Sequence, residues 1–332
     1  MLPTSNNQDF GPSFGVAYPR LLKAYLPALA VLALLALVGA LAYMVAMPGR
    51  SHGGPLPPLG ELERELAARL RHHVETLART QRNADLETPA RYIEKALAGS
   101  VRSQWFESGG RKVRNLETGA GAIVVGAHYD TVPGSPGAND NASGVAVLIE
   151  LSRMDLAVRF VAFANEEMPY FLGPEMGSYF AAKAMKDRGE PVRAMFSLEM
   201  LGYYRDAPGS QQYPFPLGFF YPDRADFVAF VGDLGSRNLV RKAIRLFREN
   251  SRFPSEGVAA PSLIPGASWS DHWSFRRHGY PAIMITDTAF YRYPHYHLPS
   301  DTPARLDYER MARVTLGIAT VLREMSNEDR DR

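Results

Sequence analysis

A histidine and four carboxylates lie at or near the ends of apolar runs between positions 123 and 167. They are His128, Asp130, Asp140, Glu166 and Glu167. Imidazole and carboxylate groups together are the ligands of zinc-type catalytic centres. This pattern predicts a hydrolase site that holds two metal ions.

His128 follows the apolar run 123–127 and precedes a stretch rich in Gly and Pro. The run has the length and the β-branched composition of a buried strand. Ligands of open α/β sheets bind beyond the carboxyl ends of the strands, so His128 stands where a functional group is expected. Asp130 suits the task of holding the other ring nitrogen of a metal-bound imidazole.

Asp140 lies in a polar loop that leads into an apolar, helix-like segment starting near residue 145. At such a position an aspartate caps the helix, because free backbone N–H groups and the helix dipole favour an anion there. Taken alone, Asp140 is best interpreted as a cap. Beside the other carboxylates, we favour a metal ligand.

Glu166 and Glu167 follow a second apolar run, residues 158–164. Adjacent carboxylates repel, and side chains alternate in direction along an extended chain. One carboxylate facing a metal and the other facing a metal-activated water would explain the pair, whereas an exposed acidic turn is the alternative. Glu199 ends a third apolar run, where a carboxylate is costly unless it is paired or bound to metal.

Taken in order, five motifs resemble the co-catalytic, two-zinc aminopeptidases. They are His-x-Asp, Asn-Asp-Asn-Ala-Ser-Gly, Glu-Glu, Leu-Glu-Met-Leu-Gly and Tyr-His-x-x-x-Asp-Thr. That family includes bacterial leucyl-type aminopeptidases, and its relatives are glutamate carboxypeptidases, glutaminyl cyclases and transferrin receptors. The resemblance extends over about residues 59–325.

By position, the resemblance implies that Asp140 bridges two Zn²⁺ ions. His128 and Glu199 would complete one site, and Glu167 and His297 the other. Many family members have Asp where this chain has Glu199, and the longer side chain changes the position of the metal.

The resemblance also implies that Glu166 is the general base and that Tyr296 steadies the developing oxyanion. His297 is preferred to His295 as the ligand, because only His297 has the family spacing to Asp301. The segment 268–275 resembles a family stretch near the site. Its Asp271 and His272 fit a role on the substrate side, a role beside the ligands, or a purely structural one.

The ligand set by itself indicates only metal-assisted hydrolysis. The resemblance implies an aminopeptidase whose partner is a peptide substrate. Three alternatives remain: a single-zinc acyltransferase of the glutaminyl cyclase type, a carboxypeptidase, and a non-catalytic receptor or scaffold on the same fold. The sequence leaves the preferred side chain and the oligomeric state open.

Composition excludes some classes of function. The chain has no cysteine, so it has no disulfides, thiolate ligands or cysteine nucleophile. The net charge is only +2 over 332 residues and no long basic stretch occurs, so nucleic acid is not an expected partner.

Residues 24–47 form 24 consecutive uncharged, mostly apolar positions, enough to span a bilayer. Arg20 and Lys23 precede them and Arg50 follows, which favours a cytoplasmic N-terminus and an exported, periplasmic or extracellular, catalytic domain. A signal peptide cleaved near residues 40–42 is the alternative. The run exceeds the usual apolar core of a signal peptide, so we favour an uncleaved anchor.

Strand-like and helix-like patterns alternate along the rest of the chain. They predict an α/β fold, a three-layer α/β/α sandwich with a central mixed, mainly parallel sheet, preceded by one N-terminal transmembrane helix. The expected parts are a cytoplasmic segment 1–23, the span 24–47, a linker 48–60 and a zinc peptidase domain 61–328. Residues 202–265, rich in Pro, Tyr and Phe, fit either a wall of the substrate pocket or surface packing.

Overall fold

The computed structural model describes residues 18–330. The chain divides into two compact units, with the border between Met44 and Val45.

The first unit contains one apolar helix, α1 (Tyr18–Val45). The segment Tyr25–Val45 has 21 residues and a mean hydropathy of 2.6, so it is long and apolar enough to cross a membrane. A signal sequence near the N-terminus has the same character. The predicted N-terminal apolar helix is therefore present.

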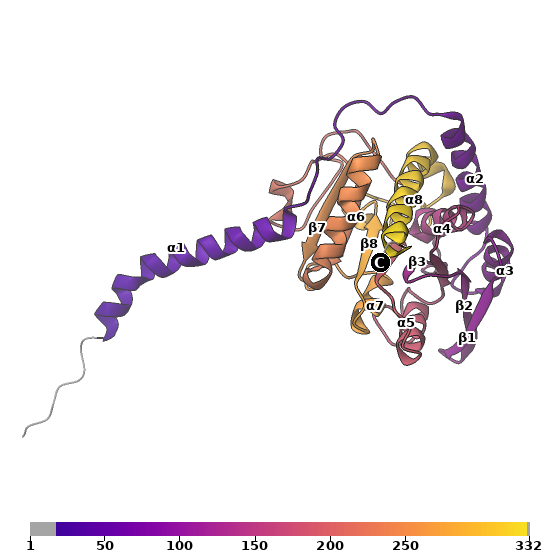
Figure 1. Cartoon of the computed structure of the whole chain (residues 1–332), viewed down its shortest axis with the longest axis horizontal. Coiled ribbons are helices and arrows are strands. Elements are labelled where there is room, and N and C mark those ends of the chain that lie inside the picture. The colour runs from indigo at the N-terminus through magenta and orange to yellow at the C-terminus, as the bar shows by residue number, and fades with distance from the viewer. Residues whose placement is uncertain (1–17, 331–332) are drawn as a thin grey trace, which may run out of the picture. The chain divides into compact units, whose positions relative to one another are not determined.

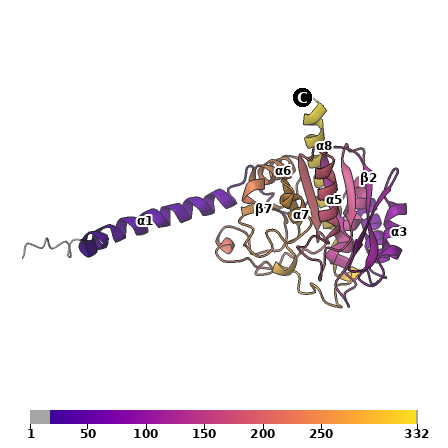
Figure 2. The same cartoon turned by 90° about the horizontal axis from the view of Figure 1, so that it is seen from below.

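The second unit is built on an eight-stranded sheet with the order β1-β2-β4-β3-β5-β8-β6-β7. The strands are β1 (Arg102–Ser108), β2 (Arg111–Gly119), β3 (Ile123–His128), β4 (Arg159–Phe163), β5 (Ala194–Glu199), β6 (Val228–Asp233), β7 (Ser255–Ala260) and β8 (Ala282–Thr286). The pairs β3–β4, β3–β5, β5–β8 and β6–β7 are parallel, and the others are antiparallel. Figure 2 shows β2 and β7 toward opposite sides of this unit.

Helices cover both faces of the sheet. They are α2 (Glu61–Leu77), α3 (Glu87–Ala96), α4 (Gly144–Ser152), α5 (Gly177–Asp187), α6 (Arg237–Asn250), α7 (His272–Arg277) and α8 (Tyr308–Arg330). On one face α2, α4, α6 and α8 pack together (Figure 1). On the other face α5 and α7 pack against each other, and their buried residues belong to a separate apolar cluster. The predicted three-layer α/β/α sandwich is confirmed.

The three apolar runs of the sequence analysis correspond to strands β3, β4 and β5. Strand β2 and the unit formed by β6, α6 and β7 were not predicted. Charged residues interrupt the apolar pattern of β2. In residues 202–265, frequent aromatic and proline residues obscure the pattern of β6, α6 and β7. Yet α6 is strongly amphipathic, with its apolar residues buried, so a helical signal was present.

Candidate metal centre

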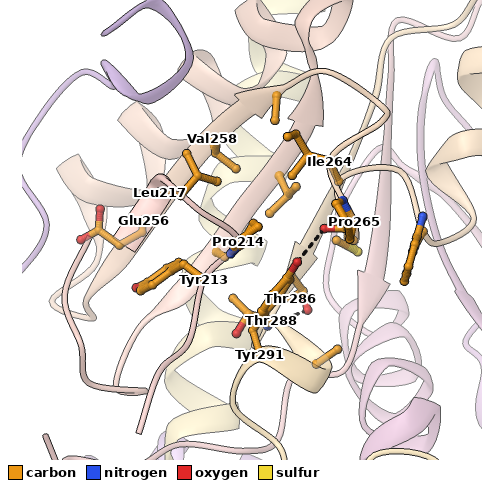
Figure 3. Close-up of a pocket in the computed structure, with 18 of the residues that line it drawn as sticks. Tyr213, Pro214, Leu217, Glu256, Val258, Ile264, Pro265, Thr286, Thr288 and Tyr291 are labelled. Atoms are coloured by element: carbon orange, nitrogen blue, oxygen red, sulfur yellow. Dashed lines mark hydrogen bonds between the residues drawn. The ribbon is translucent and has the colours of Figure 1, made fainter. Parts of the chain in front are cut away.

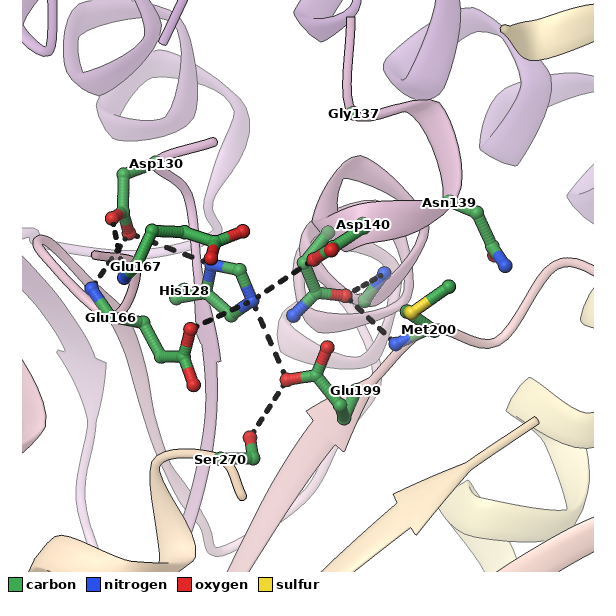
Figure 4. Close-up of polar contacts among 12 residues, drawn as sticks. His128, Asp130, Gly137, Asn139, Asp140, Glu166, Glu167, Glu199, Met200 and Ser270 are labelled. Carbon is green, nitrogen blue, oxygen red and sulfur yellow. Dashed lines mark hydrogen bonds and ion pairs between the residues drawn. The ribbon is translucent and has the colours of Figure 1, made fainter. Parts of the chain in front are cut away.

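Three neighbouring parallel strands bring three of the five predicted ligands, His128, Glu167 and Glu199, to one edge of the sheet (Figure 4). His128 is the last residue of β3 and Glu199 the last of β5. Strand β4 ends at Phe163, directly opposite His128, and Glu166 and Glu167 follow it. Because parallel strands end on the same side, residues far apart in sequence meet here.

Two groups of donor atoms share Asp140. Nε2 of His128 lies 3.5 Å from Oδ1 of Asp140 and 3.4 Å from Oε2 of Glu199. Nε2 of His297 lies 3.0 Å from Oδ2 of Asp140 and 3.5 Å from Oε1 of Glu167. Each oxygen of Asp140 therefore belongs to a different group. This arrangement suits a carboxylate that bridges two cations.

The donor set fits zinc. Ligands about 2.0–2.2 Å from a tetrahedral Zn²⁺ stand roughly 3.3–3.6 Å from one another, and three of the four donor separations fall in that range. Nε2 of His297 and Oε1 of Glu167 are buried and have no hydrogen-bond partner, as expected of atoms reserved for a metal.

The buried carboxylates of the site also need positive charge to balance them. Burial by itself lowers the pKa of His128, but the carboxylates of Glu199 and Glu166 outweigh it and hold that pKa well above its usual value. Burial also opposes the charge of His297, while its contacts with Asp140 and Glu167 raise its pKa to about 10. Protons on these imidazoles thus balance the carboxylates, and metal cations would balance them more fully.

Glu166 belongs to neither donor group around Asp140, although its carboxylate also lies close to His128 and Glu167. Its nearest approach to Nε2 of His128 is 3.9 Å, and its side chain is buried. Burial raises its pKa well above the usual range, and the nearby Glu167 and Glu199 add to the effect. A carboxylate with raised proton affinity beside metal ligands suits a general base.

Asp130 positions three of these residues. Its two oxygens accept hydrogen bonds from the backbone N–H groups of Glu166 and Glu167, each 3.0 Å long. Its Oδ1 also lies 3.5 Å from Nδ1 of His128. One carboxylate therefore sets both the turn after β4 and the orientation of the imidazole.

The loop that carries Asp140 is held by a residue for which the sequence suggested no such role. Asp301 accepts hydrogen bonds from the backbone N–H groups of Asn139 (2.8 Å) and Asp140 (3.1 Å) and from the hydroxyl of Tyr293 (2.7 Å). Its spacing from His297 was the available signal, but the spacing did not reveal these contacts.

The segment after β7 supports Glu199. Ser270 donates a 2.7 Å hydrogen bond to Oε2 of Glu199. Asp271 and His272 lie beside it and are fully buried, and His272 contacts the carbonyl of Ala267 through Nε2 at 3.1 Å. Neither belongs to the donor groups around Asp140, so the residue of this segment that touches a predicted ligand is Ser270.

Arg82 was also missed by sequence reasoning. Its side chain is 0% exposed and donates to the backbone carbonyls of Leu77, Tyr129, Pro136 and Gly137. It therefore anchors both ends of the loop between β3 and Asp140. An isolated arginine among polar residues offers no sequence signal for this role.

Three non-glycine residues at or next to the predicted ligands adopt left-handed backbone conformations. They are Asn165, Met200 and His297, with φ of 58°, 49° and 58°. Such conformations are uncommon outside glycine and collect at functional sites, where surrounding contacts hold them. Asn141 is one such contact, since its side chain bonds the backbone of Leu198 and Met200 on either side of Glu199.

A cavity of about 880 Å³, including its open mouth, adjoins the donor groups (Figure 3). Glu199 and Tyr296 line its inner end, and the Tyr296 ring stacks on that of His297 with centroids 3.7 Å apart. Most of the wall is apolar or aromatic and includes Tyr213, Leu217, Ala229, Val231, Val258, Ile264, Trp269, Met284 and Phe290. Part of the segment 202–265 is thus a wall of a pocket beside the metal centre.

Residues 112–322 match the family model described as Peptidase family M28. The chain belongs to this family. Its donor groups lie within the matched region, so this M28 peptidase is a metallopeptidase. The resemblance to the co-catalytic aminopeptidase family is confirmed.

Two curated relatives illustrate the range of the family. The uncharacterized protein YfbL of Escherichia coli (strain K12) is 40% identical over 293 residues, which cover 81% of this M28 chain and 90% of YfbL. A probable leucine aminopeptidase of Arthroderma benhamiae is 28% identical over 223 residues, covering 62% of this chain and 55% of the relative. The M28 chain therefore spans about half the length of the leucine aminopeptidase.

Two solved structures share the fold. LapB from Legionella pneumophila superimposes with a TM-score of 0.60 at 21% identity, covering 84% of this M28 chain and 78% of LapB. A glutaminyl cyclase from Porphyromonas gingivalis superimposes with a TM-score of 0.54 at 20% identity, covering 78% of this chain and 98% of the cyclase.

Proposed function

We propose that this chain is a membrane-anchored, two-zinc aminopeptidase. The observation that carries the proposal is the division of Asp140, whose Oδ1 faces His128 and Glu199 while Oδ2 faces His297 and Glu167. A single-zinc site would need only one of these groups. Residue 140 would therefore bridge two ions.

When bound, zinc supplies Lewis acidity that makes water a nucleophile near neutral pH and polarises a carbonyl group. Glu166 accepts the proton of the attacking water and passes it to the leaving amine. Asp130 holds Glu166 in place, because its carboxylate accepts a hydrogen bond from the backbone N–H of Glu166. The Tyr296 hydroxyl stays protonated because burial raises its pKa, so it is available to donate to the developing oxyanion.

The cavity favours an apolar N-terminal residue. Among the described residues that line it there is no arginine or lysine to hold the carboxylate of a peptide's C-terminus. Its two carboxylates, Glu199 and Glu256, suit a positively charged amine instead. These features support an aminopeptidase over a carboxypeptidase, and the apolar wall supports leucine-like or aromatic side chains.

Two observations bear on the remaining alternatives. A single-zinc cyclase needs only one of the two donor groups around Asp140, so one group would be redundant there. A scaffold without catalysis has no need for a buried base such as Glu166. Both observations favour the hydrolase.

The test is metal content combined with a substrate panel. Purified full-length protein should bind two zinc ions per chain by elemental mass spectrometry. It should hydrolyse leucyl-p-nitroanilide, lose this activity with a chelator, and regain it with zinc. N-acetylated substrate and peptides blocked only at the N-terminus should not react. One zinc per chain with cyclisation of N-terminal glutamine would instead identify a cyclase, and turnover of the blocked peptides would identify a carboxypeptidase.

Anchoring is supported by the length of Tyr25–Val45 and by the basic residues that precede it. We propose that the N-terminus is cytoplasmic and that the peptidase domain is exported. The intact mass of the protein recovered from membranes tests this proposal. A mass lacking the N-terminal segment would show that α1 is a cleaved signal.

A further inference from the structure

Large aromatic side chains project into solvent from residues 213–221, here named the aromatic loop. Phe215 is 85% exposed, Phe219 is 80% exposed and Phe220 is 46% exposed. Isolated apolar residues are common on protein surfaces, but three phenylalanines on one short loop form a patch that indicates an interaction site.

The aromatic loop is anchored rather than loosely attached. The hydroxyl of Tyr213 donates to the carbonyl of Pro222 (2.6 Å), and that of Tyr221 donates to the carbonyl of Gly257 in β7 (2.7 Å). Leu217 is buried and lines the cavity. Phe215 and Phe219 contact each other edge to face, with centroids 6.0 Å apart. The exposed rings are therefore presented on a fixed base.

The chain that follows the apolar helix is fastened to the same part of the second unit. Arg241 of α6 donates to the carbonyl of Ala46, and Arg248 donates to the carbonyls of Pro48 (3.0 Å) and Gly49 (3.3 Å). The backbone N–H of Ser255 in β7 donates to Oγ of Ser51 (2.9 Å). Residues 46–51 are therefore docked on α6 and β7.

Gly257 joins these two features. Its carbonyl accepts the bond from Tyr221, and a Cβ placed on it would lie 3.1 Å from Cγ of Met47. Met47 is only two residues beyond the candidate span, which ends at Val45. If that span crosses a bilayer, Met47 stands at the level of the lipid headgroups, and the aromatic loop is attached beside it.

Helix α6, on which residues 46–51 are docked, carries many basic residues. Helix α6 contributes five basic residues, Arg237, Arg241, Lys242, Arg245 and Arg248, and one acidic residue, Glu249. Lys242, Arg245 and Arg248 form ion pairs with Glu328, Glu249 and Glu256, and Arg241 donates to the carbonyl of Ala46, directly after the span. Basic side chains near a membrane attract anionic headgroups, and aromatic rings are enriched at the interface between lipid and water. An apolar patch beside a basic helix matches a lipid surface better than a soluble protein partner.

We propose that the aromatic loop inserts Phe215 and Phe219 into the outer layer of a bilayer containing anionic phospholipids, beside the point where the chain leaves the membrane. This inference rests on the proposed anchoring by α1. It gives the peptidase domain a second membrane contact, and because Leu217 of the same loop lines the cavity, the cavity lies close to the lipid surface.

The absence of cysteine makes a site-specific test straightforward, because a single introduced cysteine takes a fluorophore at one position. Three variants of the full-length protein carry the environment-sensitive fluorophore NBD: Phe219→Cys in the loop, Leu35→Cys in the span and Lys183→Cys on α5 as an exposed control. Each is placed in nanodiscs of phosphatidylcholine and phosphatidylglycerol, with and without nitroxide-labelled lipid. Retained peptidase activity shows that each variant is folded, and Phe215→Cys replaces Phe219→Cys if the latter is inactive.

The proposal expects nitroxide lipid to reduce the emission at positions 35 and 219 at least about twofold and to leave position 183 unchanged. Quenching at position 35 with none at 219 would overturn loop insertion while leaving the anchor intact. No quenching at position 35 would instead show that the proposed anchor fails. A blue-shifted but unquenched signal at position 219 would identify a protein surface, such as a second copy of the chain, and would also overturn the proposal.

Discussion

The hydroxyl of Ser270 bonds the same oxygen of Glu199, Oε2, that lies 3.4 Å from Nε2 of His128. Ser270 is thus the residue that aims Glu199 at its donor group. A glutamate has one more rotatable bond than the aspartate found at this position in many relatives, so such a restraint keeps the longer side chain in a defined place.

Replacing Ser270 should therefore weaken metal binding without removing a ligand. We expect Ser270→Ala to lower zinc affinity about 10- to 100-fold, the usual effect of losing a hydrogen-bond partner of a metal ligand. Competition with a chromophoric chelator measures this affinity. Ser274→Ala is the matched control, because Ser274 bonds Ser178 rather than a predicted ligand. Equal zinc affinities of the two variants would show that Ser270 does not support the metal centre.

Glu166→Gln should abolish most catalysis while leaving zinc in place. Loss of a general base lowers the rate about 10²- to 10⁴-fold. Because Glu166 lies outside the two donor groups around Asp140, zinc content by mass spectrometry should stay unchanged. Glu65→Gln, on an exposed side chain, is the matched control. A fully active Glu166→Gln enzyme would show that another group accepts the proton.

Ala229 of β6 lines the cavity, so a larger side chain there should narrow it. We expect Ala229→Leu to lower kcat/KM for leucyl and phenylalanyl substrates about 10-fold or more relative to alanyl substrates, since a few methylene groups in an apolar pocket discriminate by that order. The ratio of kcat/KM values across the three substrates measures the change. An unchanged ratio would place the substrate side chain elsewhere.

Burial lowers the pKa of His272 to about 4. The unfolded chain takes up this proton near its ordinary pKa of about 6.5, whereas the native protein resists it. His272 therefore makes stability fall as pH decreases from about 6.5 toward 4, by up to about 3 kcal/mol. Urea unfolding of zinc-free protein at several pH values should show a smaller fall for His272→Gln. A fall of equal size in both proteins would contradict the assignment.

Arg248 fastens the residues that follow the apolar helix, through the carbonyls of Pro48 and Gly49. Arg248→Ala should release this segment, because losing charged hydrogen bonds costs about 1–3 kcal/mol. Tryptic cleavage after Arg50, followed by mass spectrometry, should become at least about fivefold faster. Arg245→Ala is the control, since Arg245 pairs with the exposed Glu249 on the same helix. Equal cleavage rates would show that the segment is held by other contacts.

Local pattern was enough to predict the central strands, and the family resemblance selected the residues expected as donors. The apolar runs that end in His128 and Glu199 encode both a strand and the residue at its end, and Glu166 follows the end of a third such run, because the side-chain period of a strand is short. Strand β2 and the β6–α6–β7 unit escaped because charged and aromatic residues there obscured the apolar period, although α6 carries a clear helical one.

The sequence, through its motifs and their resemblance to the family, thus determined which residues we propose as ligands and base, and where the chain is apolar enough for a membrane. Only the tertiary structure decided how the oxygens of Asp140 divide between two groups and which residues support them. Asp301 reaches Asp140 across 161 positions and Ser270 reaches Glu199 across 71. Contacts of that range depend on how crossover connections pack around the sheet, and local spacing does not encode them.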